Sequence, residues 1–138
     1  MDPAQARSLQ AQLDSEVTSM KSIQESISKL IPTRQKLLTQ YNENTMVKKE
    51  LDLCSDNDSV YKLTGPVLIK CDVSDAQSNI NNRIKYFTNE LERIDINEKS
   101  LLDQRNKQQE KIQNIQNAAR HAYQQAVQSA TKQQSVTA

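Results

Sequence analysis

Two cysteines and one histidine are the side chains in this sequence best suited to hold a metal ion or to act in nucleophilic catalysis. Cys54 and Cys71 flank a short apolar segment and could approach one another, whereas His121 lies near the other end of the chain. A structural metal site needs about four ligands, and a catalytic thiol needs a neighbouring base. The sequence therefore predicts free structural thiols, a surface histidine, no metal and no catalytic residue.

Other common functional sites also lack the residues that they require. The single glycine cannot form a phosphate-binding loop, so we expect no nucleotide cofactor. The 18 basic and 17 acidic residues are interspersed, which argues against binding to nucleic acid or to an anionic membrane. No apolar run is long enough to cross a bilayer, and no secretion signal is found at the start. We therefore expect a cytoplasmic protein that is not an enzyme.

Two long runs of the sequence carry apolar residues at alternating spacings of three and four, which is typical of coiled coils. The first run has two seam rows: Leu13, Met20, Ile27, Arg34, Tyr41 and Lys48, and Leu9, Glu16, Ile23, Leu30, Leu37, Asn44 and Leu51. The second run begins at Ile80 and continues through Ala126. Polar seam residues can set the register, and Arg34 lies roughly opposite Glu98 as a candidate ion-pair partner. The pattern predicts a mainly α fold, a long antiparallel two-helix coiled coil, in a single domain over 1–138.

Capping residues and breakers predict where the helices begin and end. Asp2 and Pro3 predict a first helix over 4–53, and Ser74 with Gln77 forms a capping box that predicts a second helix over 75–124. Pro32 lies inside the first run without changing its register, so we expect one helix kinked near residue 32, with two separate helices as the alternative. The polar segment 125–138 is expected to be disordered.

A β-like insert separates the two helical runs and predicts a hairpin over 59–71. With Thr64, Gly65 and Pro66 as the loop, Leu63 would face Val67 and Tyr61 would face Ile69, giving one apolar face. A two-residue loop would shift this pairing and mix the faces. An isolated hairpin is marginal in water and has two unpaired edges, so we expect other subunits to complete the sheet. The alternative is that it folds onto its own coiled coil. The residues expected to assemble are Val60, Tyr61, Leu63, Val67, Leu68 and Ile69.

A second group of apolar residues lies at the far ends of the two helical runs. Its members are Leu9, Leu13, Val17, Met20, Ile112 and Ile115. If the helices splay there, these side chains could bind apolar segments of other proteins. Alternatively they pack against each other as ordinary seam residues, and their heptad positions favour this second interpretation.

Several stretches of the sequence resemble the β-class subunits of the prefoldin family over about residues 7–120. They are Arg34-Gln35-Lys36-Leu37, Glu43-Asn44, Val47-Lys48-Lys49-Glu50-Leu51, Val60-Tyr61-Lys62-Leu63-Thr64-Gly65-Pro66-Val67-Leu68 and Asn82-Arg83-Ile84-Lys85-Tyr86. The heptads alone are unspecific, whereas the hairpin stretch between them is specific.

The resemblance implies a role as well as a fold. It implies a hetero-hexamer of α- and β-class prefoldin subunits whose hairpins form an inter-subunit β-barrel. The coiled-coil tips would hold unfolded clients of the actin and tubulin class and deliver them to the cytosolic chaperonin without ATP. The six hairpin residues would then serve assembly, and the six residues at the helix ends would bind the client. A structural coiled-coil adaptor or tether without client binding is the competing hypothesis.

Overall fold

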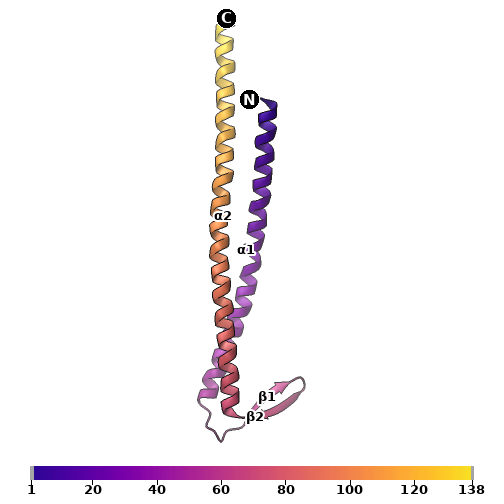
Figure 1. Cartoon of the computed structure of the whole chain (residues 1–138), viewed down its shortest axis with the longest axis vertical. Coiled ribbons are helices and arrows are strands. Elements are labelled where there is room, and N and C mark those ends of the chain that lie inside the picture. Colours follow the sequence, from indigo (N-terminus) through magenta and orange to yellow (C-terminus); the bar gives the residue numbers. More distant parts are fainter. Residues whose placement is uncertain (1, 138) are drawn as a thin grey trace. The chain divides into compact units, whose positions relative to one another are not determined.

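The computed structural model describes residues 2–137, which form two long helices and a hairpin between them (Figure 1). Helix α1 spans Pro3–Asp52, strand β1 Val60–Thr64, strand β2 Val67–Cys71 and helix α2 Val73–Thr137. Two compact units can be distinguished, one within 1–28 and 99–138 and the other within 29–98. Each unit contains a segment of both helices, and the second also contains the hairpin. The predicted mainly α fold with an inserted hairpin is confirmed, and a single domain over 1–138 stays a prediction.

Helix α1 begins next to the predicted capping residue and continues without a break through Pro32. The Oδ1 atom of Asp2 accepts a hydrogen bond from the backbone N–H of Ala4 at 3.3 Å, and the Asp2 carbonyl accepts one from Ala6 at 3.0 Å. Pro3 takes the first helical position, where a missing N–H costs nothing. Pro32 is exposed and lies inside the continuous helix, so the alternative of two separate helices is wrong. A kink near residue 32 stays a prediction.

Helix α2 begins at Val73, earlier than expected, and the predicted capping box of Ser74 and Gln77 is wrong. The carbonyl of Asp72 accepts the Ala76 N–H at 3.0 Å, so Asp72 is the residue that precedes the helix. Nε2 of Gln77 instead donates to the carbonyl of Leu51 at 3.2 Å. The last carbonyls of a helix have no partner within that helix, and the side chain of Gln77 supplies one to the carbonyl of Leu51. This hydrogen bond joins the end of α1 to the start of α2.

Helix α2 also continues much further than expected, so the disordered tail predicted over 125–138 is wrong for its described residues. The helix extends through Thr137, and residue 138 lies outside the described part of the chain. No glycine or proline interrupts this segment, and lengthening an existing helix needs no new nucleation. Figure 1 shows the last turns of α2 extending past the start of α1.

Every residue of the heptad rows predicted from the sequence is buried or half-buried within its unit, and Val73 is buried in addition to them. Within 29–98 the buried apolar residues are Leu51, Val73, Ile80, Phe87 and Ile94. In the other unit the seam residues from Leu9 to Ile27 and from Leu101 to Ala126 are mostly half-buried. None of the described side chains is fully buried, because two packed helices cover only one stripe of each other.

The hairpin has a tighter loop than the one predicted. Strands β1 and β2 pair antiparallel with Leu63 opposite Leu68 and Thr64 opposite Val67, so the loop contains only Gly65 and Pro66. The predicted pairing of Leu63 with Val67 is therefore wrong. Gly65 has a φ of 61°, and proline holds the next φ near −65°. This combination is that of a type II′ turn, whose twist matches the right-handed twist of the paired strands.

Candidate functional site

The observed register distributes the apolar side chains over both faces of the hairpin instead of one. Paired residues share a face and consecutive residues point to opposite faces. One face therefore carries Tyr61, Leu63, Leu68 and Lys70, and the other carries Val60, Lys62, Thr64, Val67, Ile69 and Cys71. The single apolar face predicted from the sequence is wrong, and a partner must cover both sides to remove these residues from water.

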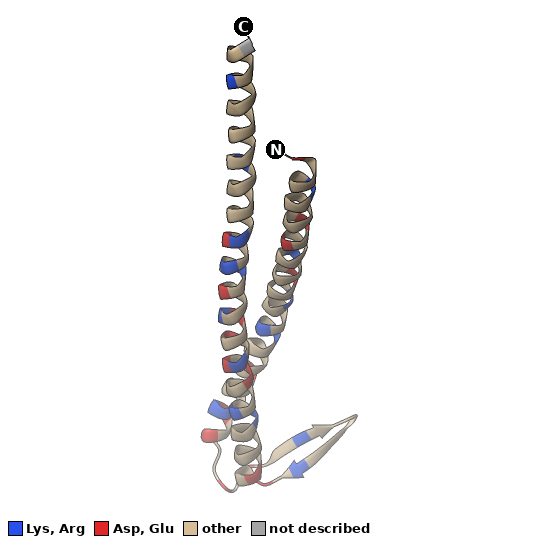
Figure 2. Cartoon of the chain, turned by 45° about the horizontal axis from the view of Figure 1, so that its top comes forward, with Lys and Arg blue, Asp and Glu red and all other residues tan. Residues whose placement is uncertain are grey.

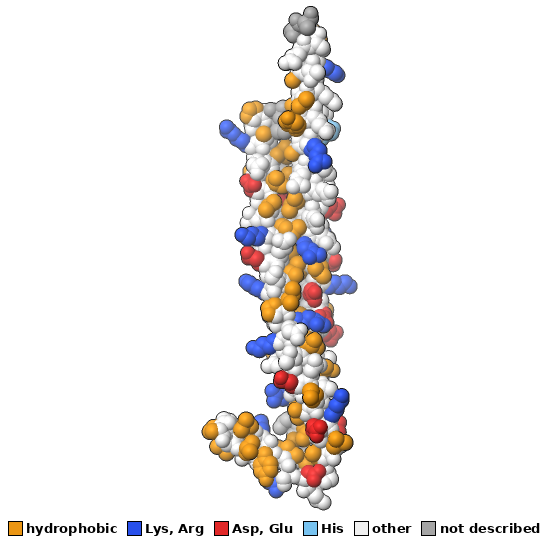
Figure 3. Space-filling view, turned by 180° about the vertical axis from the view of Figure 1, so that it is seen from behind, with side chains coloured by type: hydrophobic (Ala, Val, Ile, Leu, Met, Phe, Trp, Pro, Cys, Tyr) orange, Lys and Arg blue, Asp and Glu red, His pale blue; other side chains and the backbone are white. Residues whose placement is uncertain are grey.

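Most of the residues predicted to serve assembly are open to solvent. Tyr61 is 55% exposed, Leu63 68%, Val67 55%, Leu68 63% and Ile69 52%, whereas Val60 is half-buried. Figure 3 shows these hydrophobic side chains gathered on the hairpin. Two strands with two free edges and two uncovered apolar faces are marginal in water. Strands of another chain could pair with either edge and cover either face.

A second apolar feature lies in the unit formed by the first part of α1 and the later part of α2. A groove of about 310 Å³, here called the terminal groove, opens between the two helices. Its lining residues are Ala6, Leu9, Gln10, Leu13, Ile115, Gln116 and Ala119. The groove carries no charged side chain, so it suits apolar or uncharged groups.

The structure brings only some of the predicted client-binding residues into this groove. Leu9, Leu13 and Ile115 line it. Met20 and Ile112 are half-buried seam residues, and Val17 is 50% exposed outside the seam row. Ala6, Gln10, Gln116 and Ala119 also line the groove and were not among the predicted client-binding residues. Ala6 could have been predicted, because Ala6, Leu9 and Leu13 continue the alternating spacing of three and four residues. Gln10 and Gln116 follow no pattern that distinguishes them from other surface residues.

A buried glutamine holds the two helices together about two turns of α2 from the terminal groove. Gln108 is only 7% exposed, and its Nε2 donates a hydrogen bond to the carbonyl of Glu16 at 2.8 Å. The same nitrogen also bonds the Glu16 carboxylate. Because a buried amide must find partners, this pair favours one register of α1 against α2. Both residues belong to the heptad rows predicted from the sequence.

The polar seam residue Arg34 pairs with a different acid from the one predicted. Nε of Arg34 lies 2.8 Å from Oδ1 of Asp95, and the two side chains are 41% and 52% exposed. The hydrogen bond and the charge of Asp95 raise the pKa of Arg34 above its ordinary value. The expected ion pair with Glu98 is wrong, although the negative charge of Glu98 also raises the pKa of Arg34. A surface pair such as Arg34 and Asp95 contributes little to stability.

The two thiols and the histidine predicted to have no chemical role lie in separate environments. Cys54 and Cys71 are both half-buried and unbridged, and the Cys54 thiol donates to the Glu50 carbonyl at 3.4 Å. His121 is exposed on α2. Within residues 2–137, no three His, Cys, Asp or Glu side chains gather as metal ligands would. None of the described helices combines the length and the hydropathy that a membrane span requires.

Together, two long helices packed antiparallel within each unit and an uncovered apolar hairpin between them define a coiled-coil hairpin protein. The chain belongs to the prefoldin family: the family model described as "Prefoldin subunit" matches residues 14–119. Prefoldin subunit 6 of Arabidopsis thaliana is 37% identical over 116 residues, covering 84% of this chain and 90% of that relative. Prefoldin subunit 6 of Homo sapiens is 35% identical over 111 residues, covering 80% and 86%.

A solved structure has the same fold. The crystal structure of the prefoldin beta subunit from Thermococcus strain KS-1 superposes with a TM-score of 0.70, covering 75% of this chain and 90% of that chain. Its sequence identity of 20% supports the fold only. The arrangement of two helices and one hairpin is therefore that of a prefoldin beta subunit.

Proposed function

We propose that this chain is one subunit of a hetero-hexameric, ATP-independent chaperone that holds unfolded proteins. Membership of the prefoldin family supports assembly with other prefoldin subunits. The observation that carries the proposal is the uncovered hairpin, because five of its apolar side chains are more than half exposed in the isolated chain. A sheet of this kind gains stability only when other strands pair with its edges and cover its faces.

The proposed assembly residues are those of the hairpin, and strands from neighbouring subunits would close the sheet into a barrel. Closure removes free edges, which otherwise pair with any available strand. Lys62 and Lys70 protect these edges from uncontrolled pairing while the chain is free, because charged residues on edge strands oppose aggregation.

The proposed client site is the terminal groove together with Val17, Met20 and Ile112 beside it. The groove combines aliphatic side chains with uncharged glutamines, so it can take varied apolar segments without a specific hydrogen-bond pattern. Unfolded actin and tubulin are the proposed clients and the cytosolic chaperonin is the proposed recipient, in the cytoplasm. These choices rest on the family resemblance.

Glutamine substitutions at Leu9, Leu13 and Ile115 test the client site. Chemically denatured actin is diluted into the complex assembled with the variant chain, and its aggregation is followed by light scattering. We expect suppression of aggregation to weaken while the mass of the complex stays unchanged. The matched control is Ile96→Gln, which changes an exposed isoleucine outside the groove. Suppression equal to that of the unmodified complex would show that the groove does not hold the client.

One observation favours a second candidate function, that of a structural tether. Leu9, Leu13 and Ile115 are half-buried against each other's helices, as residues of a closed seam would be. A tether needs a defined partner and leaves unfolded proteins alone. If denatured actin scatters as much light with the unmodified complex as it does without it, the tether is supported and the chaperone function is excluded.

A further inference from the structure

A second groove lies at the base of the hairpin, where the strands meet the ends of both helices. It has a volume of about 190 Å³ and is here called the hairpin groove. Its lining residues are Val47 and Leu51 of α1, Val60, Tyr61, Lys62 and Cys71 of the hairpin, and Ala76, Asn79, Ile80 and Arg83 of α2. Leu51 and Ile80 are buried and Val60 and Cys71 are half-buried. The groove is continuous with the exposed hairpin, because Lys62 and Val60 share a face with Val67 and Ile69.

The charged side chains of the hairpin groove are all of one sign and have no acidic partner. Lys62 and Arg83 line it, and no aspartate or glutamate does. Within residues 2–137 neither of them forms an ion pair, in contrast to Arg34 and Arg93. The hairpin also carries Lys70 and no acidic residue between positions 60 and 71. Figure 2 shows that the charged positions of the two strands are all basic, whereas both signs occur on the helices.

We propose that the hairpin groove receives an apolar side chain flanked by a carboxylate from a neighbouring prefoldin subunit that is a different chain. The apolar walls bury the inserted side chain, and the carboxylate meets Lys62 and Arg83. This inference rests on the proposed assembly through the hairpin and adds the chemistry of the partner. The hairpin of a second copy would bring two more lysines and no acid, and like charges in contact oppose pairing. The groove therefore selects an acidic neighbour over a copy of itself.

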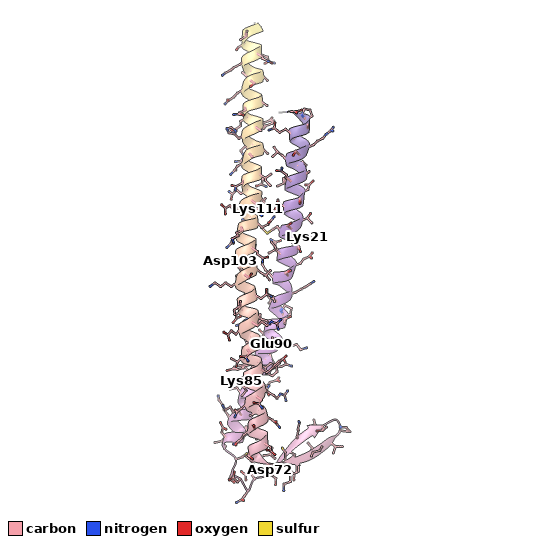
Figure 4. All side chains as sticks on the ribbon, viewed as in Figure 1. Lys21, Asp72, Lys85, Glu90, Asp103 and Lys111 are labelled. Carbon is pink, nitrogen blue, oxygen red and sulfur yellow. The ribbon has the colours of Figure 1, made fainter. Side chains whose placement is uncertain are left out.

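Charge reversal at the groove gives the first test. The chain is assembled with the other prefoldin subunits of its organism, and its dissociation from the complex is measured by native mass spectrometry. Lys62→Glu and Arg83→Glu should each raise the dissociation constant about tenfold or more, because a close charge pair becomes a repulsive one. Both positions are exposed, so the helices should fold normally. The matched control is Lys85→Glu, because Lys85 is an exposed residue of α2 that does not line the groove (Figure 4).

The thiol of Cys71 gives a second measurement that does not depend on affinity. A Cys54→Ser background leaves Cys71 as the chain's own thiol, and its reaction with an aromatic disulfide reagent is followed by mass spectrometry. Reaction should be fast in the free chain and strongly slowed in the complex, because the inserted side chain covers the groove. Equal reaction rates in the two states would show that the groove stays open.

The outcomes separate this inference from the proposed assembly. Aspartate at both Leu63 and Leu68 tests assembly, whereas Lys62→Glu and Arg83→Glu test the groove. If the first variant releases the chain but the groove variants leave the complex as stable as the control Lys85→Glu does, only the groove inference is wrong. If neither set of variants changes the complex, assembly through the hairpin is wrong as well. A stable dimer of the purified chain alone, broken by Arg83→Glu, would identify a second copy as the occupant and overturn the requirement for an acidic neighbour.

Discussion

Replacing Leu63 and Leu68 together by aspartate should release the chain from its complex without unfolding its helices. The two leucines are directly opposed across the hairpin and are 68% and 63% exposed. Neither belongs to the helix seam, so the isolated chain has little packing to lose. The substitution therefore acts on the interface that the hairpin offers to its neighbours.

The size of the effect follows from the surface that these leucines still expose. Burying a whole leucine side chain contributes about 1.5–3 kcal/mol. Since roughly two-thirds of each leucine is open, the pair should contribute about 2–4 kcal/mol to assembly. A change of about 1.4 kcal/mol is a factor of ten, so losing the pair weakens binding about 30- to 700-fold. Enclosing two carboxylates in an apolar sheet adds a further penalty.

Size-exclusion chromatography with light scattering measures release, and circular dichroism measures helix content. We expect the variant to elute as a small helical species apart from the complex. The matched control replaces Ile31 and Ile96 by aspartate, because these residues are 66% and 65% exposed but lie on helices outside the hairpin. A variant that remains in the complex with unchanged affinity would refute the argument that the exposed hairpin drives assembly.

Three smaller changes test the elements that support the hairpin and the seam. Gln108→Ala removes both hydrogen bonds to Glu16 and should lower the free energy of unfolding by about 2 kcal/mol in urea titrations; unchanged stability would mean that water replaces the amide. Gly65→Ala forces a side chain into a φ of 61° and should weaken hairpin protection in hydrogen exchange by about 1 kcal/mol, with helix protection as the control. Because Asp95 raises the pKa of Arg34, the guanidinium stays charged at neutral pH, and the contribution of Arg34 to the pair is lost at strongly alkaline pH as it deprotonates. The small stability difference between wild type and Arg34→Ala should therefore stay constant from pH 6 to pH 9 and shrink as salt is added; a difference that changes across this pH range would contradict the assignment.

The seam and the presence of the hairpin could be predicted because both depend on local periodicity. The spacing of Leu9, Leu13 and Glu16 specifies a helix face wherever the helix lies, and the residues expected in the seam are the ones withdrawn from solvent. The pairing within the hairpin could not be predicted in the same way. Two loop lengths were compatible with the sequence, and the tighter turn at Gly65 and Pro66 placed Leu63 against Leu68.

Details that depend on contacts between distant segments were predicted less well. Gln77 looked like part of a local capping box, but its side chain bonds Leu51 across the junction of the two helices. Arg34 was expected to pair with Glu98, but it lies against Asp95. In both cases several possible hydrogen-bond or ion-pair partners lie within one helical turn of each other. The rotation of one helix relative to the other determines which of them the side chain contacts.

The sequence by itself determined the two heptad runs and the hairpin between them. These are properties of short stretches of chain, because hydrophobic spacing and turn chemistry act over a few residues. Only the tertiary structure decided which apolar side chains share a hairpin face, and it gathered Ala6 with Ile115 in one groove and Lys62 with Arg83 in another. Those neighbours are far apart in the chain, and the register of strand on strand and of helix on helix brings them together.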